Sequence, residues 1–200
     1  MGGMLMVAKK FYVSGGNFHE LQAVFSQIKG VIATRTGYIN ATIPDPTYEE
    51  VLTGKVIAVM GLEIVYNPKK IDISTLIEIL VTVTSPYSKD KHGQCQGSMY
   101  ASGVYYIDAE DEPIVDLNMN FIANRRLESN IKNSPLIVNE SNGSMLNRRK
   151  CYAKAMRLRN FYVAEAIHQD YLQKHPKTET FIDFRRLQEL EVIESLLDSN

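Results

Sequence analysis

The stretch Ser14-Gly15-Gly16-Asn17-Phe18-His19-Glu20 decides how this chain folds, because two glycines turn a strand directly into a helix. The residues before it, Lys-Lys-Phe-Tyr-Val at 9–13, are rich in aromatic and branched side chains and predict a strand. After the turn, apolar residues recur at helical spacing and predict one buried helix face: Phe18, Leu21, Phe25 and Ile28. Asn17 starts this helix with Glu20 three residues later, the spacing of a capping box. A helix start also binds anions or lowers the pKa of a thiol, but spacing alone favours Asn17 as a cap.

The composition is that of an ordinary globular protein and disfavours several classes. The chain has 200 residues, of which 44% are hydrophobic, and its 22 Lys and Arg nearly balance 23 Asp and Glu. This balance indicates neither a nucleic-acid nor a membrane partner, and no apolar run approaches the roughly 20 residues of a membrane span. Two cysteines, Cys95 and Cys151, are too few for a disulfide framework. The first residues do not have the pattern of a signal peptide, so we expect a cytoplasmic protein.

Strand and helix patterns alternate along the rest of the chain. Strands are predicted at residues 31–39, 57–66, 104–107 and 136–138, and helices at 48–52, 74–83, 111–130, 161–174 and 184–197. Thr47 and Glu50 have capping-box spacing at the start of the helix at 48–52. Residues 87–103 form a long polar loop, and loops of this length often carry function. This order of elements predicts an α+β fold with helices packed on a sheet.

Several motifs together resemble one family over residues 10–176. They are Gly16-Asn17-Phe18-His19, Gly37-Tyr38, Pro46-Thr47-Tyr48-Glu49-Glu50-Val51, the loop from Gly93 to Ser102, and Phe161-Tyr162 with Ala164-Glu165 and His168-Gln169-Asp170-Tyr171-Leu172. Their order and spacing are similar to those of peptide methionine sulfoxide reductase A. The resemblance implies a ferredoxin-like two-layer α+β sandwich in a single domain of residues 1–200. Its core would span about 9–176, with a basic insert at about 135–160 and a C-terminal helical tail at about 177–200.

The resemblance also assigns roles to particular positions, and the departures from the family are concentrated there. In the family a cysteine thiolate attacks the sulfoxide sulfur, a glutamic acid and two tyrosines act on the oxygen, and a Phe-Trp pair holds the methyl group. Here the nucleophile position is Asn17, the acid position is Ile57, the tryptophan is His19, and a loop aspartate is Cys95; Phe18, Tyr38 and Tyr100 are retained.

The chemistry of these substitutions predicts a family member that does not catalyse the family reaction. An asparagine amide has no ionisable or redox-active group, and Ile57 has no proton to donate. We therefore expect no intact catalytic residues, no metal and no cofactor. Phe18, His19, Tyr38 and Tyr100 would keep a pocket for methionine sulfoxide or a methionine-containing peptide.

Two alternatives stay open at this point. In the first, Cys95 is a displaced nucleophile, assisted by His92 or His19 and resolved by Cys151, with thioredoxin or another thiol as reductant. In the second, the basic insert contacts nucleic acid or an acidic partner; because no RNA-binding pattern accompanies its charges, a solvated insert is the better interpretation.

His168 is a candidate metal ligand or base. No second histidine follows it at helical spacing of three or four residues, which argues against a zinc site and favours a packed, hydrogen-bonded histidine.

Overall fold

A computed structural model of the chain describes residues 8–124, 150–180, 182, 184 and 187. Its strands are β1 Lys9–Ser14, β2 Val31–Ile39, β3 Val59–Tyr66, β4 Lys91–His92, β5 Cys95–Gln96, β6 Gly103–Tyr106, β7 Lys154–Arg157 and β8 Phe161–Val163. Its α-helices are α1 Phe18–Phe25, α2 Tyr48–Leu52, α3 Ile73–Val83, α4 Glu112–Asn124 and α5 Tyr171–Lys174. Short 3-10 turns at Ser98–Tyr100, Ala109–Asp111 and Ala166–His168 complete the described elements.

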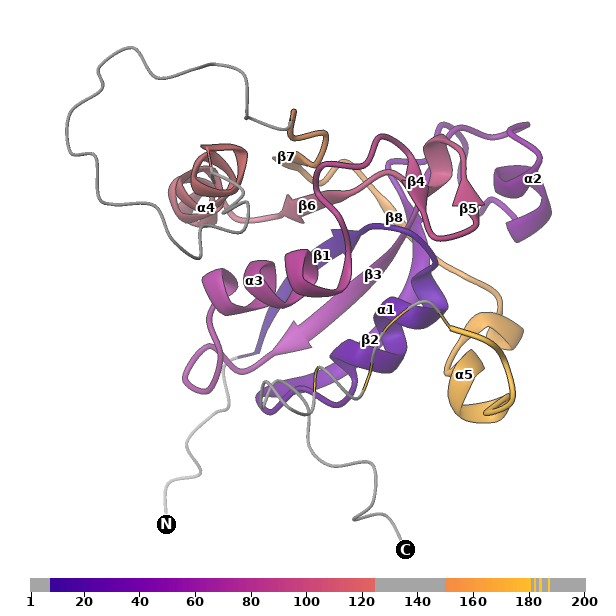
Figure 1. Cartoon of the computed structure of the whole chain (residues 1–200), viewed down its shortest axis with the longest axis horizontal. Coiled ribbons are helices and arrows are strands. Elements are labelled where there is room, and N and C mark those ends of the chain that lie inside the picture. Colours follow the sequence, from indigo (N-terminus) through magenta and orange to yellow (C-terminus); the bar gives the residue numbers. More distant parts are fainter. Residues whose placement is uncertain (1–7, 125–149, 181, 183, 185–186, 188–200) are drawn as a thin grey trace, which may run out of the picture.

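One sheet in the order β7-β6-β1-β3-β2-β8 organises the molecule (Figure 1). Its neighbouring strands are antiparallel, except that β7 runs parallel to β6. The small hairpin of β4 and β5 lies in the long polar loop, as a separate two-stranded sheet. The α+β character predicted from the sequence is therefore confirmed.

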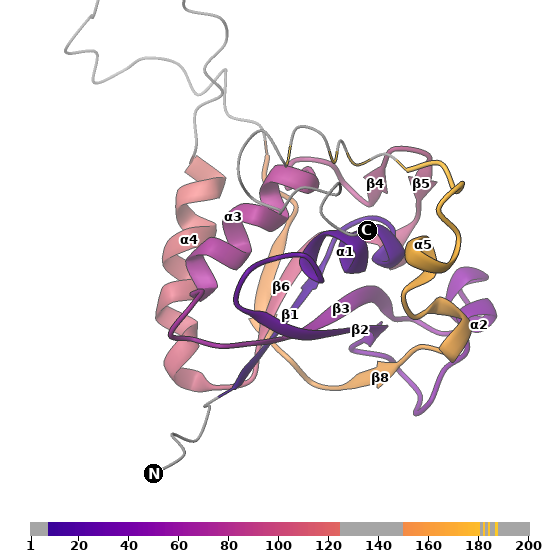
Figure 2. The same cartoon turned by 90° about the horizontal axis from the view of Figure 1, so that it is seen from below.

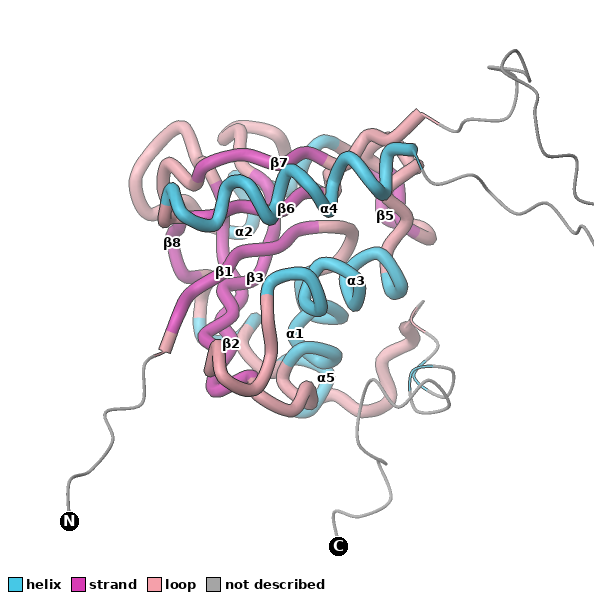
Figure 3. Tube along the Cα trace, turned by 90° about the vertical axis from the view of Figure 1, so that its left-hand side faces the viewer, coloured by secondary structure: helices cyan, strands magenta, loops and turns pink. Residues whose placement is uncertain are grey.

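Three helices cover one face of this sheet. Along β1, Phe11 and Val13 point into the core beneath the helices, whereas Tyr12 points to the opposite face, as the two-residue strand period requires. The main core joins these strands to apolar side chains of all three helices, including Leu21 and Phe25 of α1, Leu76, Ile77 and Leu80 of α3, and Val115, Met119 and Ile122 of α4. Figure 3 shows the three helices along this side of the strands.

The other face is covered by chain rather than by helices. After β7 the chain crosses from one edge of the sheet to the other, and Leu158 and Phe161 pack there on Tyr12, Ile39 and Tyr105 (Figure 2). Backbone hydrogen bonds fix this crossing at both ends: Leu158 N donates to the carbonyl of Tyr106 on β6, and the carbonyl of Asn160 accepts from the N–H of Asn40.

A buried carboxylate, Glu63 of β3, lies on this second face. The Tyr12 hydroxyl and the Lys10 ammonium donate to its Oε2 at 2.8 and 3.2 Å, and Arg35 Nε donates to Oε1 at 2.8 Å. Burial alone would raise the pKa of Glu63, but the hydrogen bonds from Tyr12, Arg35 and Lys10 outweigh it and lower the pKa. We call Glu63, Tyr12, Lys10 and Arg35 the Glu63 network.

Several predicted elements match the structure closely. Thr47 caps α2 in a capping box with Glu50, as predicted. The first helix is confirmed but ends at Phe25 rather than Ile28, and the strand predicted from Ile57 begins at Val59.

The helix predicted over 161–174 is wrong. Its first three residues form β8, because aromatic and branched side chains pair along the edge of β2, with Tyr162 opposite Tyr38. A 3-10 turn and the four-residue α5 follow, separated by Asp170, whose φ of 53° is left-handed and cannot continue a helix.

The sequence patterns also missed β7, whose exposed edge carries the charged residues Lys154 and Arg157 of the basic insert. The strand predicted at 136–138, the end of the helix predicted at 111–130 and most of the predicted tail lie outside the described residues. Within the tail, Leu187 is buried in the main core. None of the helices in the described part of the chain is long and apolar enough to cross a membrane.

Candidate functional site

The turn between β1 and α1 depends on glycine. Gly16 has a φ of +73°, and a Cβ built on it would lie 2.8 Å from Cβ of His92, so a larger residue is excluded twice over. The Gly16 N–H donates to the carbonyl of Tyr100 at 3.0 Å, which holds the turn against the loop that follows β5.

Asn17 is the N-cap of α1. Its Oδ1 accepts from the backbone N–H of His19 at 3.0 Å, so the predicted cap is confirmed. The acceptor meets the second helical residue rather than Glu20, the third, as a capping box would have it. The amide oxygen of Asn17, the residue that the resemblance assigns to the nucleophile position, therefore caps the helix start.

An aromatic cluster surrounds the first residue of α1. Phe18 is fully buried, and its ring centroid lies 6.2 Å from Tyr38, 6.1 Å from Tyr48 and 5.8 Å from His168. His19 contacts the Phe18 ring at 4.7 Å. We call Phe18, His19, Tyr38, Tyr48 and His168 the aromatic cluster; its members come from α1, β2, α2 and the turn after β8.

Glu165 ties the tyrosine of β2 to α2. The Tyr38 hydroxyl donates to Oε2 of Glu165 at 2.6 Å, and the Tyr48 backbone N–H donates to Oε1 at 2.8 Å. Burial would raise the pKa of Glu165, but these two donors lower it overall, whereas burial and the carboxylate raise the pKa of Tyr38. At neutral pH the site thus holds a carboxylate and a neutral tyrosine whose proton is already engaged.

Cys95 lies at the edge of this arrangement. Tyr100 lies close enough to Cys95 and Tyr48 to affect the pKa values of both, and it packs with Tyr48 against the buried residues around Phe18. Burial, followed by the charge of Glu20, raises the pKa of Cys95, and Tyr100 offsets this only in part. Cys95 is therefore mainly a thiol, not a thiolate, at neutral pH.

The two histidines considered as helpers for Cys95 are paired elsewhere. His92 Nε2 lies 3.0 Å from the hydroxyl of Ser102, and His19 Nε2 lies 3.1 Å from Nδ1 of His168. The second bond confirms the packed, hydrogen-bonded role predicted for His168. Cys151 is a free thiol against the main core, as Cys95 is free in its loop.

Ile57 does not join the aromatic cluster. It is 71% exposed, and its carbonyl accepts from the N–H of Thr42. The β3 residue that packs with Phe18 and Tyr38 is Met60, which pairs with Tyr38 across the strands. Both residues are apolar, so neither brings an acid to this end of β3.

Sequence reasoning did not predict that Tyr48, Met60 and Glu165 belong to the site. It also did not predict that His168 hydrogen-bonds with His19. Tyr48 and Glu165 stand in motifs that had served only as evidence of family resemblance, whereas His168 was predicted to be hydrogen-bonded but without a named partner. A polar residue in a family motif was the available signal for Glu165.

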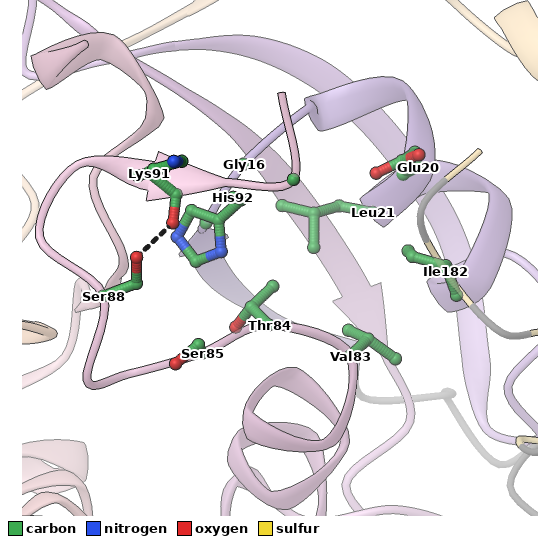
Figure 4. Close-up of a pocket in the computed structure, with 12 residues that line it drawn as sticks. Gly16, Glu20, Leu21, Val83, Thr84, Ser85, Ser88, Lys91, His92 and Ile182 are labelled. Carbon is green, nitrogen blue, oxygen red and sulfur yellow. Dashed lines mark hydrogen bonds between the residues drawn. The ribbon is translucent and has the colours of Figure 1, made fainter. Parts of the chain in front are cut away.

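A cleft of about 350 Å³ borders the same turn (Figure 4). Figure 4 shows Leu21, Val83 and Ile182 on one side, with His92, Lys91 and Ser88 opposite them. The lining combines apolar and charged side chains, with no thiol among them. In the described ranges, no group of three or more His, Cys, Asp or Glu side chains is placed to hold a metal ion.

Comparison with known proteins places this site in a family. The family model "Peptide methionine sulfoxide reductase" matches residues 9–195. Peptide methionine sulfoxide reductase MsrA of Mycoplasma genitalium is 35% identical over 176 residues, covering 88% of this chain and 99% of that protein. The protein of the same name from Clostridium acetobutylicum is 31% identical over 168 residues, covering 84% and 91%.

Solved structures agree on the fold. Methionine sulfoxide reductase A of Corynebacterium diphtheriae superposes with a TM-score of 0.70 at 19% identity, covering 90% of this chain and 80% of that one. Mxr1 from Saccharomyces cerevisiae in reduced form gives 0.68 at 19% identity, covering 86% and 88%. The family model and the sequence relatives span most of the chain, and we conclude that this protein belongs to the peptide methionine sulfoxide reductase family.

Proposed function

We propose that this family member binds methionine sulfoxide, or a related methyl-bearing group, without reducing it. The observation that carries the proposal is the use of Asn17 as a helix cap at the position where the resembled enzymes have their cysteine. A carboxamide cannot form the sulfenic acid through which a thiol removes oxygen from a sulfoxide.

The surroundings of Asn17 support the same conclusion. Ile57 lies two residues before β3 and Met60 is the second residue of that strand, and neither has a proton to give to a sulfoxide oxygen. Tyr38 has its hydroxyl proton directed at Glu165, which the lowered pKa keeps ionised. Losing both the nucleophile and the acid removes two separate contributions to the rate.

Binding would use the aromatic side chains that remain. Phe18 and Tyr48 offer apolar ring surface to a methyl group, and the half-buried Tyr100 offers a hydroxyl donor to the sulfoxide oxygen. Because Phe18 and Tyr38 are fully buried, a ligand has to displace part of the covering chain to reach them.

Two measurements test this proposal. Calorimetric titration with a peptide containing methionine sulfoxide should give binding at millimolar ligand or tighter, and Tyr100→Phe should weaken it. A reductase assay with dithiothreitol should give no turnover for the wild-type chain. Turnover by wild type at rates like those of the relatives, or no heat of binding, would contradict the proposal. An Asn17→Cys variant in the same assay shows whether the rest of the site can still use a thiol.

A second candidate function rests on Cys95, a free and partly exposed thiol close to Tyr100 at the edge of the aromatic cluster. In this reaction the Cys95 sulfur attacks the sulfoxide sulfur to form an S–S bond, and the S–O bond breaks as the doubly protonated oxygen leaves as water. Water then attacks the Cys95 sulfur and breaks the S–S bond, which releases the thioether and a proton and leaves a Cys95 sulfenic acid. Two equivalents of a thiol such as thioredoxin would then reduce the sulfenic acid to the thiol, releasing water and a disulfide. Wild-type turnover lost in Cys95→Ser, but kept in Cys151→Ser, would establish this function in place of the first.

We also infer the finer features that the resemblance implies. The order β6-β1-β3-β2, with α1 and α3 as the connections, supports a ferredoxin-like sandwich within one domain. A cytoplasmic location and a solvated basic insert stay predictions from composition and pattern. Gel-shift and sizing experiments at two salt concentrations would test whether the insert binds nucleic acid.

A further inference from the structure

Residues 165–175, which we call the strap, contribute His168 to the aromatic cluster and cover its other members from outside. The strap holds the 3-10 turn Ala166–His168 and the helix α5, and it lies against α1 (Figure 1). It contacts the cluster at three points: Glu165 accepts from Tyr38, His168 stacks on Tyr48 at 4.2 Å, and Tyr171 stacks on His19 at 4.4 Å.

Several hydrogen bonds hold the strap, and one of them joins it to α1 through two imidazole rings. The others are between uncharged groups: the Asp170 N–H donates to Gln22 of α1 at 2.7 Å, and the Gln169 amide pairs with the backbone of Thr36 on β2 at 3.0 Å. His19 Nε2 and His168 Nδ1 are 3.1 Å apart, and the two residues are only 7% and 9% exposed. The two imidazole rings are nearly parallel. Tyr171 stacks on His19, and Tyr48 stacks on His168. In the resembled enzymes the first of these positions is tryptophan, so the pair exists because of this chain's own substitution.

The hydrogen bond between His19 and His168 can form only while the two rings are not both fully protonated. A bond between two imidazole nitrogens needs one proton, given by one ring and accepted by the other. When both rings are fully protonated, both nitrogens are donors, and two cations face each other at hydrogen-bond distance in a poorly hydrated site. Such a contact cannot persist.

We propose that the His19–His168 hydrogen bond is an acid-sensitive latch, whose full protonation releases the strap and uncovers Phe18. This goes beyond ligand binding and does not depend on it. The latch determines the pH range in which a ligand can reach the aromatic cluster, and it does so for any ligand.

The charged groups around the pair define the pH range. Burial and then His168 lower the pKa of His19 to about 4, and burial lowers the pKa of His168, opposed by the carboxylate of Glu165. Other ionisable residues on these elements are Glu20 of α1 and Asp170, Lys174 and His175 of the strap; Tyr48 and Tyr171 contribute uncharged rings. Because the closed strap binds fewer protons than an opened one, its stability is complete above about pH 6.5. It is lost as the pH falls toward 4.

Hydrogen exchange on the full chain tests the latch directly. Protection of strap amides, corrected for intrinsic rates, should fall at least about tenfold between pH 7 and pH 4, while α3 amides keep their protection. His168→Phe keeps a stacked ring without a titrating group and should remove this pH dependence. His175→Phe is the matched control, because the His175 ring lies tilted against Tyr171 at 4.5 Å, outside the pair, and this variant should behave as wild type.

A second measurement covers the case in which His168→Phe does not fold. An NMR titration of the wild-type chain should show His19 and His168 gaining protons well below pH 6.5, together with the loss of strap protection. Burial also lowers the pKa of His92, but that residue hydrogen-bonds with Ser102 outside the strap, so its resonance is assigned and followed separately. Strap protection that is unchanged down to pH 4, or His19 and His168 titrating near pH 6.5, would overturn the latch. So would a His175→Phe variant that loses the pH dependence. Sulfoxide binding plays no part in these readouts, so its failure would leave the latch standing.

Discussion

The Glu63 network and the His19–His168 pair are both buried polar groupings in contact with the same sheet, but they are held together differently. Glu63 receives hydrogen bonds from residues on its own strand's neighbours, at positions fixed by the register of β1, β2 and β3. The histidine pair joins α1 to a segment nearly 150 residues later, through one bond between identical groups. The first grouping pairs a charge with opposite charges, and the second depends on both partners staying largely uncharged.

The two groupings should therefore fail in different pH ranges. The pKa of Glu63 is lowered from 4.5, so its contribution to stability is present above about pH 4.5 and is lost only as the pH falls through the lowered value. The pair weakens from about pH 6.5 downward. Acid should thus detach the strap while the sheet is still intact.

The largest effect is expected from removing the buried carboxylate. Glu63→Ala leaves the hydroxyl of Tyr12 buried without its acceptor and Arg35 and Lys10 without their partner, which should lower the free energy of unfolding by about 3 kcal/mol. Urea unfolding measures this change. Glu110→Ala, which removes a solvent-exposed ion pair with Lys9, is the control and should leave the urea midpoint close to that of the wild type. Equal losses of unfolding free energy in the two variants would show that burial does not make the Glu63 network more stabilising than an exposed ion pair.

A smaller effect is expected where β2 meets the strand that leads into the strap. A Cβ added at Gly37 would lie 2.4 Å from the ring of Phe161 and 2.4 Å from the carbonyl oxygen of Tyr162. Gly37→Ala should therefore push β8 away and cost about 2 kcal/mol, with strap amides exchanging faster than those of β1. Gly54→Ala is the comparison, because that Cβ meets nothing within 4 Å and only the positive φ opposes it. If strap amides in Gly37→Ala kept the protection of the wild type, the stability of the strap would not depend on the pairing of β8 with β2.

The smallest effect is expected at the start of α1. Asn17→Ala removes the cap and should lower the free energy of unfolding by about 1 kcal/mol, measured by thermal or urea unfolding. Asn17→Asp keeps an acceptor and adds a charge that suits the helix start, so it should be at least as stable as wild type. An Asn17→Ala variant as stable as wild type would remove the helix-cap explanation for this residue.

Local patterns were sufficient for much of the fold. Aromatic and branched alternation marked β1 and β2, and the capping residues Asn17 and Thr47 marked the starts of their helices. The same rules failed at 161–174, because a short strand there forms only when the edge of β2 is available to pair with it. Pairing across distant segments is not visible in local periodicity.

Some residues of the candidate site could likewise be predicted from the sequence, and others could not. The resemblance identified Phe18, His19, Tyr38 and Tyr100, and the structure gathers the first three in one cluster, with Tyr100 packed beside the buried Phe18 and Tyr38. It also assigned Ile57 to the acid position, whereas Met60 occupies the inward place at the start of β3. A single sequence could not show this, because which residue of a strand points inward depends on its register with β2.

The crossing of the chain over the second face has a consequence for how the molecule is assembled. Both edge strands, the cover of Tyr12 and Tyr105, and the whole strap come from residues after 149. A protein made as two separate pieces, 1–124 and 150–200, would therefore have to be reconstituted by association before either the enclosed Tyr12 or the enclosed Phe18 could exist. Complementation between such fragments would report on both faces of the sheet in a single binding event.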